Sequence, residues 1–127
     1  MSSPFNPGYG LIIVWAQLWG PTGDTVARLA LDTGATSTVI SAAVLSTIGY
    51  DPTASPTRVR MTTGSGVEYA ARLDVARIEA LGKRRTNFSL ICHTLPPAVS
   101  VDGLLGLDFL RGQRLTIDFR AGRIALR

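Results

Sequence analysis

Short apolar runs separated by turn residues follow one another along the whole chain. The first run, Leu11–Leu18, leads through the turn residues Gly20–Asp24 into a second run, Thr25–Leu31. Two apolar runs joined by a turn rich in Gly and Pro are typical of a β-hairpin. This hairpin ends at Asp32, which makes it the first candidate for a polar group delivered by a buried strand.

Most of the remaining runs also have the pattern of strands. Apolar residues alternate from Val67 to Val75, and their parity then shifts at Ala76, which predicts a long strand with a bulge or bend. Further strands are predicted at Thr38–Ile40, Arg58–Met61, Asn87–His93, the first part of Asp102–Leu110, Leu115–Phe119 and Ile124–Leu126.

Only two segments have helix signals. Ser41 precedes an alanine-rich run that Gly49 ends, which predicts a helix with Ser41 as its N-cap. Asp108 is expected to cap a second, shorter helix that ends at Gly112. Many short strands with one or two short helices predict an all-β domain, closed into a barrel or packed as a sandwich.

The chain has the length of one domain. Its 127 residues are 46% apolar, which argues against disorder. Residues 1–10 have the composition of a tail or linker, and residues 11–127 form the predicted domain. The run Leu11–Leu18 is too short to cross a bilayer and lacks a basic leader, so we expect no membrane span and a cytoplasmic location.

Charge and metal-binding residues exclude several classes of function. The net charge is +4, but the basic residues are scattered, and the densest cluster, Lys83–Arg85, lies in a predicted turn. We therefore expect no nucleic-acid partner.

Cys92 and His93 are the only residues of their types. They are too few for a structural zinc site, and as strand neighbours they point to opposite faces, so we expect no metal and no Cys–His catalytic pair.

Asp32 has the setting of a catalytic carboxylate. An apolar strand delivers it into the polar turn Asp32-Thr33-Gly34-Ala35-Thr36, and another apolar stretch follows. A carboxylate held at the base of a cleft can take or give a proton. The alternative is an ordinary turn aspartate that bonds its own backbone.

Three motifs together resemble the retropepsin-like branch of the aspartic proteases. Asp32-Thr33-Gly34-Ala35 resembles the active-site signature, and the Gly-rich hairpin Thr62–Gly66 lies where the family has its flap. Leu104-Leu105-Gly106 resembles the apolar-apolar-Gly element near the family's C-terminus. The wider run Asp102–Leu110 is more similar to bacterial than to viral members, and the resemblance covers residues 11–126.

The resemblance implies a closed, β-barrel-like retropepsin (acid protease) fold and an aspartic endopeptidase without cofactor. It implies catalytic roles for Asp32, Thr33 and Gly34. The residues expected to bind an extended peptide substrate are Ala35, Thr36, Thr62, Thr63, Gly64, Ser65 and Gly66. Viral members usually carry an acidic residue soon after Asp-Thr-Gly-Ala, where this chain has Thr36-Ser37-Thr38.

One Asp-Thr-Gly motif supplies only one of the two carboxylates that the reaction needs. Two carboxyl groups in hydrogen-bond range share one proton, and one then acts as base and the other as acid. We therefore expect a homodimer with one Asp32 from each subunit at the two-fold axis. The apolar segments Leu11–Leu18 and Ile124–Arg127 are expected to pair across its interface.

Two other functions were weighed against the endopeptidase. The first is a catalytically weak relative that binds extended peptides or serves as a dimerisation module. The second is nucleotide binding, since an Asp-x-Gly-x-Thr loop after a strand also resembles the phosphate loop of actin-like ATPases. Those ATPases need two large α/β domains, for which this chain has neither the length nor the helices.

Overall fold

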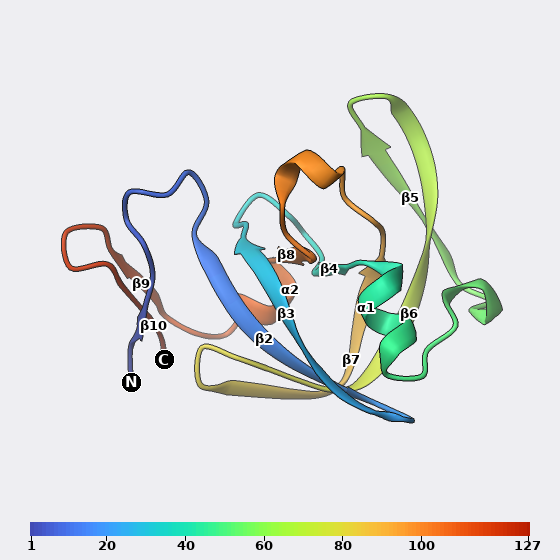
Figure 1. The fold of residues 1–127 in the computed structure, drawn as a ribbon, viewed down its shortest axis with the longest axis horizontal. Coiled ribbons are helices and arrows are strands. Elements are labelled where there is room, and N and C mark those ends of the chain that lie inside the picture. Colours follow the sequence, from blue (N-terminus) through green and yellow to red (C-terminus); the bar gives the residue numbers. More distant parts are fainter.

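The computed structural model describes residues 1–127, apart from the side chain of Thr63, and shows a mostly β architecture (Figure 1). The strands are β1 (Ser3–Pro4), β2 (Ile13–Gly20), β3 (Gly23–Leu31), β4 (Val39–Ile40), β5 (Arg58–Thr63), β6 (Gly66–Ala80), β7 (Lys83–Cys92), β8 (Gly103–Leu105), β9 (Leu115–Asp118) and β10 (Arg123–Leu126). The helices are α1 (Ala42–Thr47), α2 (Leu107–Leu110) and the 3₁₀ turns η1 (Pro52–Ala54) and η2 (Pro97–Val99).

Six of these strands close into a barrel, which confirms the predicted fold class. The larger sheet has the order β2-β3-β8-β4-β7-β6-β5, and β2 also pairs with β6. Apolar side chains that point inward fill the barrel. Fully buried examples are Leu18, Leu29, Val75, Ile78, Leu90, Leu105 and Phe109. Burial of side chains of this size, each worth about 1.5–3 kcal/mol, is the main force that holds the strands together.

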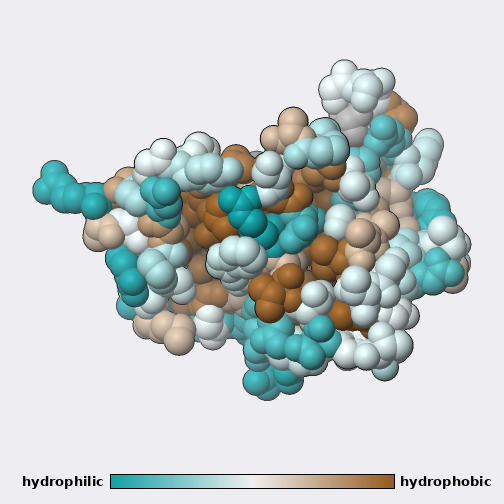
Figure 2. All heavy atoms as spheres, in the orientation of Figure 1, coloured by the Kyte–Doolittle hydropathy of each residue, from teal (hydrophilic) through white to brown (hydrophobic). Residues whose placement is uncertain are grey.

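The predicted first hairpin is present, although β2 begins and ends two residues later than expected. β2 pairs with β3 along its whole length, and its segment Ala16–Trp19 also pairs with Arg77–Ala80 of β6. Because these residues already have a strand on both sides, the expectation that Leu11–Leu18 pairs across a subunit interface is wrong for this part. Trp15 and Val26 of the hairpin are exposed. Figure 2 shows that hydrophobic residues also reach the surface near the centre of the viewed face.

The long strand β6 is distorted where the apolar parity shifts. Val75 pairs with Phe88 and Arg77 with Thr86, so the register is the same on both sides of the distortion. Between these pairs the Ala76 N–H donates to the Tyr50 hydroxyl at 2.7 Å. The distortion therefore contains no inserted residue, and the Tyr50 hydroxyl, which also donates to the Trp19 carbonyl at 3.2 Å, joins β6 to β2 at this point.

The two ends of the chain meet in a small separate sheet of order β1-β10-β9. Residues 3–4, in the segment whose composition suggests a tail or linker, pair with Arg123 and Ile124 of β10. β10 therefore has β9 on one side and β1 beside its first two residues. β1 and β9 form the two edges of this sheet, and among the described residues Ala125 and Leu126 have no second strand partner, so the pairing of Ile124–Arg127 across a subunit interface stays a prediction.

Helix α1 begins as predicted. The Ser41 hydroxyl accepts a hydrogen bond from the Val44 N–H at 3.4 Å, and Gly49 follows the helix with a φ of +96°, a conformation that glycine adopts without strain. Elsewhere, the β5–β6 hairpin projects from the body of the molecule (Figure 1). Within the described part of the chain, no helix has both the length and the apolar character needed to span a bilayer.

Candidate active site

Asp32 lies directly after β3, where the strand meets β8. The two strands run parallel, with Leu29 opposite Gly103 and Leu31 opposite Leu105. The Asp32 N–H then donates to the Leu105 carbonyl at 3.0 Å. Asp32 is half-buried, and its backbone is held at the end of β3 by a residue about 70 positions later in the sequence.

The turn after Asp32 fixes the direction of its carboxylate. The Gly34 N–H donates to Asp32 Oδ1 at 2.9 Å, and the Ala35 N–H donates to the Asp32 carbonyl at 3.2 Å. A Cβ on Gly34 would lie 3.1 Å from Oδ1, so the residue without a side chain allows this close approach. Thr33, Gly34 and Thr36 are exposed, whereas Asp32 and Ala35 are half-buried.

The exit from the loop is anchored by Thr38 and Asp108. The fully buried Thr38 donates its hydroxyl to Asp108 Oδ1 at 2.7 Å and its N–H to Oδ2 at 2.8 Å. The same hydroxyl accepts the Gly106 N–H at 3.1 Å. Hydrogen bonds to an ionised carboxylate are among the strong ones in proteins, so this arrangement gives the loop a rigid base.

The prediction that Asp108 caps the second helix is wrong. The N-cap of α2 is Gly106, which has no side chain to form a cap, and Asp108 lies in the first turn. Its carboxylate still accepts the Phe109 N–H at 2.8 Å, but it also reaches across to Thr38. The sequence analysis did not identify Thr38 or Asp108 as part of the site, because Thr38 is the last of three consecutive hydroxyl residues and nothing local distinguishes it.

Gly103 in β8 and Gly106 directly after it allow two segments of the backbone to pass close to each other. A Cβ at Gly103 would lie 1.8 Å from the Val39 carbonyl oxygen, and one at Gly106 would lie 2.8 Å from the Ala35 carbonyl oxygen. The Leu107 N–H donates to that same Ala35 carbonyl at 2.8 Å. The apolar-apolar-Gly element therefore packs directly against the loop that follows Asp32, which gives a physical reason for the pattern seen in the sequence.

The hairpin predicted as a flap is present, and its tip is Gly64-Ser65. Thr62 pairs with Val67 and Thr63 with Gly66, whose φ is +124°. The side chain of Thr63 lies outside the described structure. In Figure 1 the tip stands away from the loop that follows Asp32, so the single chain does not bring these two sets of predicted residues together.

A hollow separates the flap from the loop that follows β7. Its lining is formed by Gly64, Ser65, Glu68, His93, Thr94, Leu95, Pro96 and Pro97. His93 Nε2 lies 3.7 Å from Glu68 Oε2 across this hollow. The side chain of His93 therefore faces the flap and not the buried Cys92 thiol, whose pKa is raised by burial.

The chemistry available to this loop is proton transfer at one oriented carboxylate. In the described part of the chain, no three His, Cys, Asp or Glu side chains come together in a way that could hold a metal ion. The chain contains a single Asp-Thr-Gly sequence. A second carboxylate in an equivalent position would have to come from another molecule.

Comparisons with known proteins agree with this geometry. A family model described as aspartyl protease matches residues 20–109. The fold is similar to the crystal structure of a retropepsin-like aspartic protease from Rickettsia conorii, with a TM-score of 0.68 and 19% sequence identity over 99% of this chain and 88% of that chain. No curated protein sequence matches the chain. The resemblance to retropepsin-like proteins of the bacterial type is thereby confirmed.

Proposed function

The chain belongs to the aspartyl protease family, and from this premise we propose that it is a homodimeric aspartic endopeptidase. The observation that carries the proposal is the Asp32 carboxylate, oriented by the Gly34 N–H at 2.9 Å in a loop anchored by Thr38 and Asp108. The retropepsin-like fold supports it, and the substrate class is a polypeptide bound in extended conformation.

The proposed reaction needs the Asp32 of both subunits. One carboxylate, unprotonated, takes a proton from a water molecule while the water oxygen attacks the scissile carbonyl carbon. The other, protonated, gives its proton to the carbonyl oxygen. The tetrahedral intermediate then collapses: one of its hydroxyl groups gives a proton to the ionised carboxylate, the C–N bond breaks, and the leaving nitrogen accepts the proton held by the other carboxyl group. Two carboxyl groups that share one proton suit this exchange of roles.

Several residues are proposed to support this chemistry without taking part in proton transfer. The Thr33 hydroxyl is proposed to form hydrogen bonds across the dimer axis, and Ala35 and Thr36 to align the substrate backbone. Flap residues 62–66 are proposed to close over the bound peptide, which excludes water and adds main-chain hydrogen bonds. The flap tip and the catalytic loop stand apart in one chain, which fits a site completed by substrate and by a second subunit.

The first test is digestion of a diverse peptide library by the wild-type protein and by Asp32→Asn. We expect cleavage by the wild type only, because the amide cannot act as a base. A pepstatin-type inhibitor should bind the wild type and block cleavage. If the wild type binds peptides but cleaves none, the chain is instead the weak peptide-binding or dimerisation module considered above.

The second test concerns assembly. Adding an excess of Asp32→Asn subunits to active subunits should suppress activity as subunits exchange, because mixed dimers hold one working carboxylate. Full activity at large excess contradicts a shared site. The pH profile of kcat/KM should be bell-shaped, and a rate that continues to rise through alkaline pH contradicts the dyad.

The cellular location is a separate part of the proposal. A cytoplasmic protein is what we expect, and fractionation of cells that express the full-length protein tests it.

A further inference from the structure

Arg72 lies on the face of β6 that is turned toward the catalytic loop. Alternate residues of a strand share a face, so Arg72 and Ala70 lie on the same side of β6. Ala70 belongs to a small apolar cluster with Val39 of β4 and Ile91 of β7, and Leu104 of β8 packs against it. This cluster is separate from the main core and joins the base of the flap to the strands that hold the catalytic loop.

The guanidinium of Arg72 is held by two serine hydroxyls. Nη2 donates to Ser37 Oγ at 3.2 Å, and Nη1 donates to Ser89 Oγ at 3.1 Å. Ser37 follows the loop residues Ala35 and Thr36 that are proposed to align the substrate. The contact therefore places a cationic group at the end of the catalytic loop.

This cation has no carboxylate partner among the residues that the structure describes. The ion pairs in that part of the chain are Arg84–Glu79 and His93–Glu68. Asp51 and Asp74 line the same surface hollow as Arg72, but neither is in ion-pair distance of it. The Asp51 carboxylate instead accepts the N–H and the hydroxyl of Thr53. A half-buried guanidinium with five donors and two neutral partners can bind a further anionic group.

The position of Ser37 places the Arg72 cation beside the loop that is proposed to bind the substrate. Ser37 lies between Thr36, which is proposed to align the substrate, and the buried Thr38, which anchors the loop to Asp108. This chain has hydroxyl groups there and an arginine beside them. Arg72 therefore places a positively charged group directly beside the end of this loop.

We propose that Arg72 is a specificity-determining residue that selects substrates with an aspartate or glutamate side chain at the position bound beside Ser37. This inference rests on the proposed function, because it needs an extended peptide in the cleft. A homodimer repeats Arg72 in each subunit, so the preference for an acidic side chain is expected on both sides of the scissile bond.

The test measures peptide binding to Asp32→Asn, which does not depend on turnover. Fluorescent peptides are made in pairs that differ only by Asp or Asn at one position, from four residues before the scissile bond to four after it. We expect at least one pair in which the Asp peptide binds about tenfold more tightly, the effect of one charge-assisted hydrogen bond. The difference should decrease as ionic strength rises.

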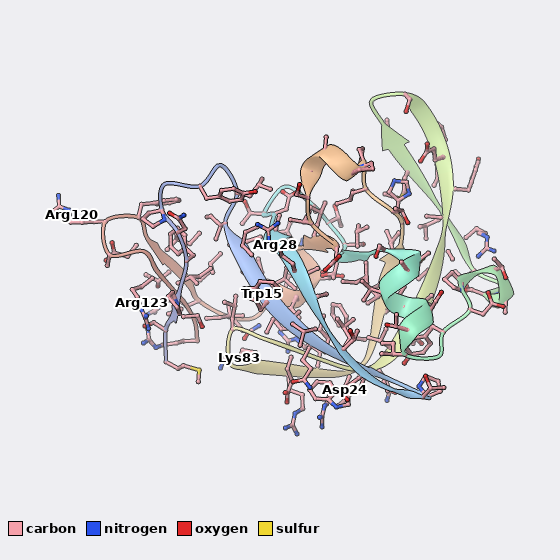
Figure 3. The ribbon with its side chains drawn as sticks, in the orientation of Figure 1. Trp15, Asp24, Arg28, Lys83, Arg120 and Arg123 are labelled. Carbon is pink, nitrogen blue, oxygen red and sulfur yellow. The ribbon has the colours of Figure 1, made fainter. Side chains whose placement is uncertain are left out.

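Two variants of the Asp32→Asn protein remove the proposed charge in different ways. Arg72→Gln deletes the cation, and Ser37→Asp keeps Arg72 but gives it a carboxylate partner within the protein. Both should remove the preference for Asp, and Ser37→Asp decides the question if Arg72→Gln does not fold. Arg120→Gln is the matched control, because this exposed arginine lies near the turn between β9 and β10, far from the flap (Figure 3). It should keep the preference.

Each outcome has a separate meaning for the inference and for the proposed function. The inference is overturned if no pair shows a preference for Asp, if no peptide binds, or if the preference survives in a folded Arg72→Gln or in Ser37→Asp. Cleavage by the wild type is scored independently on the same peptides. A wild type that cleaves without acid preference supports the protease and refutes the role of Arg72. Acid-selective binding without cleavage supports the role of Arg72 and contradicts the protease.

Discussion

Removal of the Asp108 carboxylate should destabilise the protein and loosen the catalytic loop. In Asp108→Ala, three hydrogen bonds are lost, two from Thr38 at 2.8 and 2.7 Å and one from the Phe109 N–H at 2.8 Å. A hydrogen bond to a charged group contributes about 1.5–3 kcal/mol, and bonds that share one carboxylate are less than additive. Because Thr38 is fully buried, its N–H has no access to water in compensation. We expect a loss of about 3 kcal/mol in the free energy of unfolding.

Urea and thermal denaturation measure this loss. For a domain of this length, about 3 kcal/mol corresponds to a fall in Tm of roughly 10 °C. A double-mutant cycle with Thr38→Val isolates the bond between the two side chains, and we expect a coupling energy of about 1–2 kcal/mol. Peptide hydrolysis should fall with the loss of the anchor. A destabilisation below about 0.5 kcal/mol, or a coupling energy near zero, refutes the assignment of Asp108 as the anchor of the loop.

Three further predictions follow from single sites. Gly106→Ala should abolish or strongly reduce peptide hydrolysis, because its Cβ would lie 2.8 Å from the Ala35 carbonyl oxygen; hydrolysis at the wild-type rate contradicts this packing. The hydroxyl and then the N–H of Thr53 lower the pKa of Asp51 below its ordinary value of 3.8, so this carboxylate stabilises the fold above that pH and loses its effect as the pH falls through its folded pKa. An NMR titration should show the Asp51 midpoint moving upward in Thr53→Ala, and an unchanged midpoint counts against the hydroxyl. Burial raises the pKa of Cys92, so its thiol should react with a disulfide reagent at neutral pH at least about tenfold faster in urea than in the folded protein; equal rates would show that the thiol is accessible.

The local features of the fold were predictable from neighbouring residues. The β2–β3 hairpin, the Ser41 cap of α1 and the flap tip at Gly64-Ser65 each depend on a few consecutive residues. Hydrophobic alternation and turn chemistry act over such distances, so the pattern carries their signal. The same holds for the change in β6 near Ala76, where the parity shift marked the distortion without revealing the Tyr50 hydroxyl that joins β6 to β2 there.

The contacts that complete the candidate site were not predictable in this way. Thr38 and Asp108 are 70 residues apart in sequence, and Ser37 and Arg72 are 35 apart. Their meeting depends on which strands become neighbours in the barrel, and no local pattern specifies that order. For the same reason, the sequence analysis predicted Asp108 as a helix cap, because neighbouring residues alone suggest that role for a carboxylate near the start of a helix.

The parallel pairing of β3 with β8 has a consequence for how the protein is made. During synthesis, Asp32 leaves the ribosome long before Gly103–Leu105, whose strand holds the aspartate backbone. Contacts between such distant segments form late, because a long loop must close first. A nascent or truncated chain that lacks Gly103–Leu105 therefore carries the Asp-Thr-Gly sequence without the contacts that hold the loop, and the proposed activity requires this strand to have folded against β3.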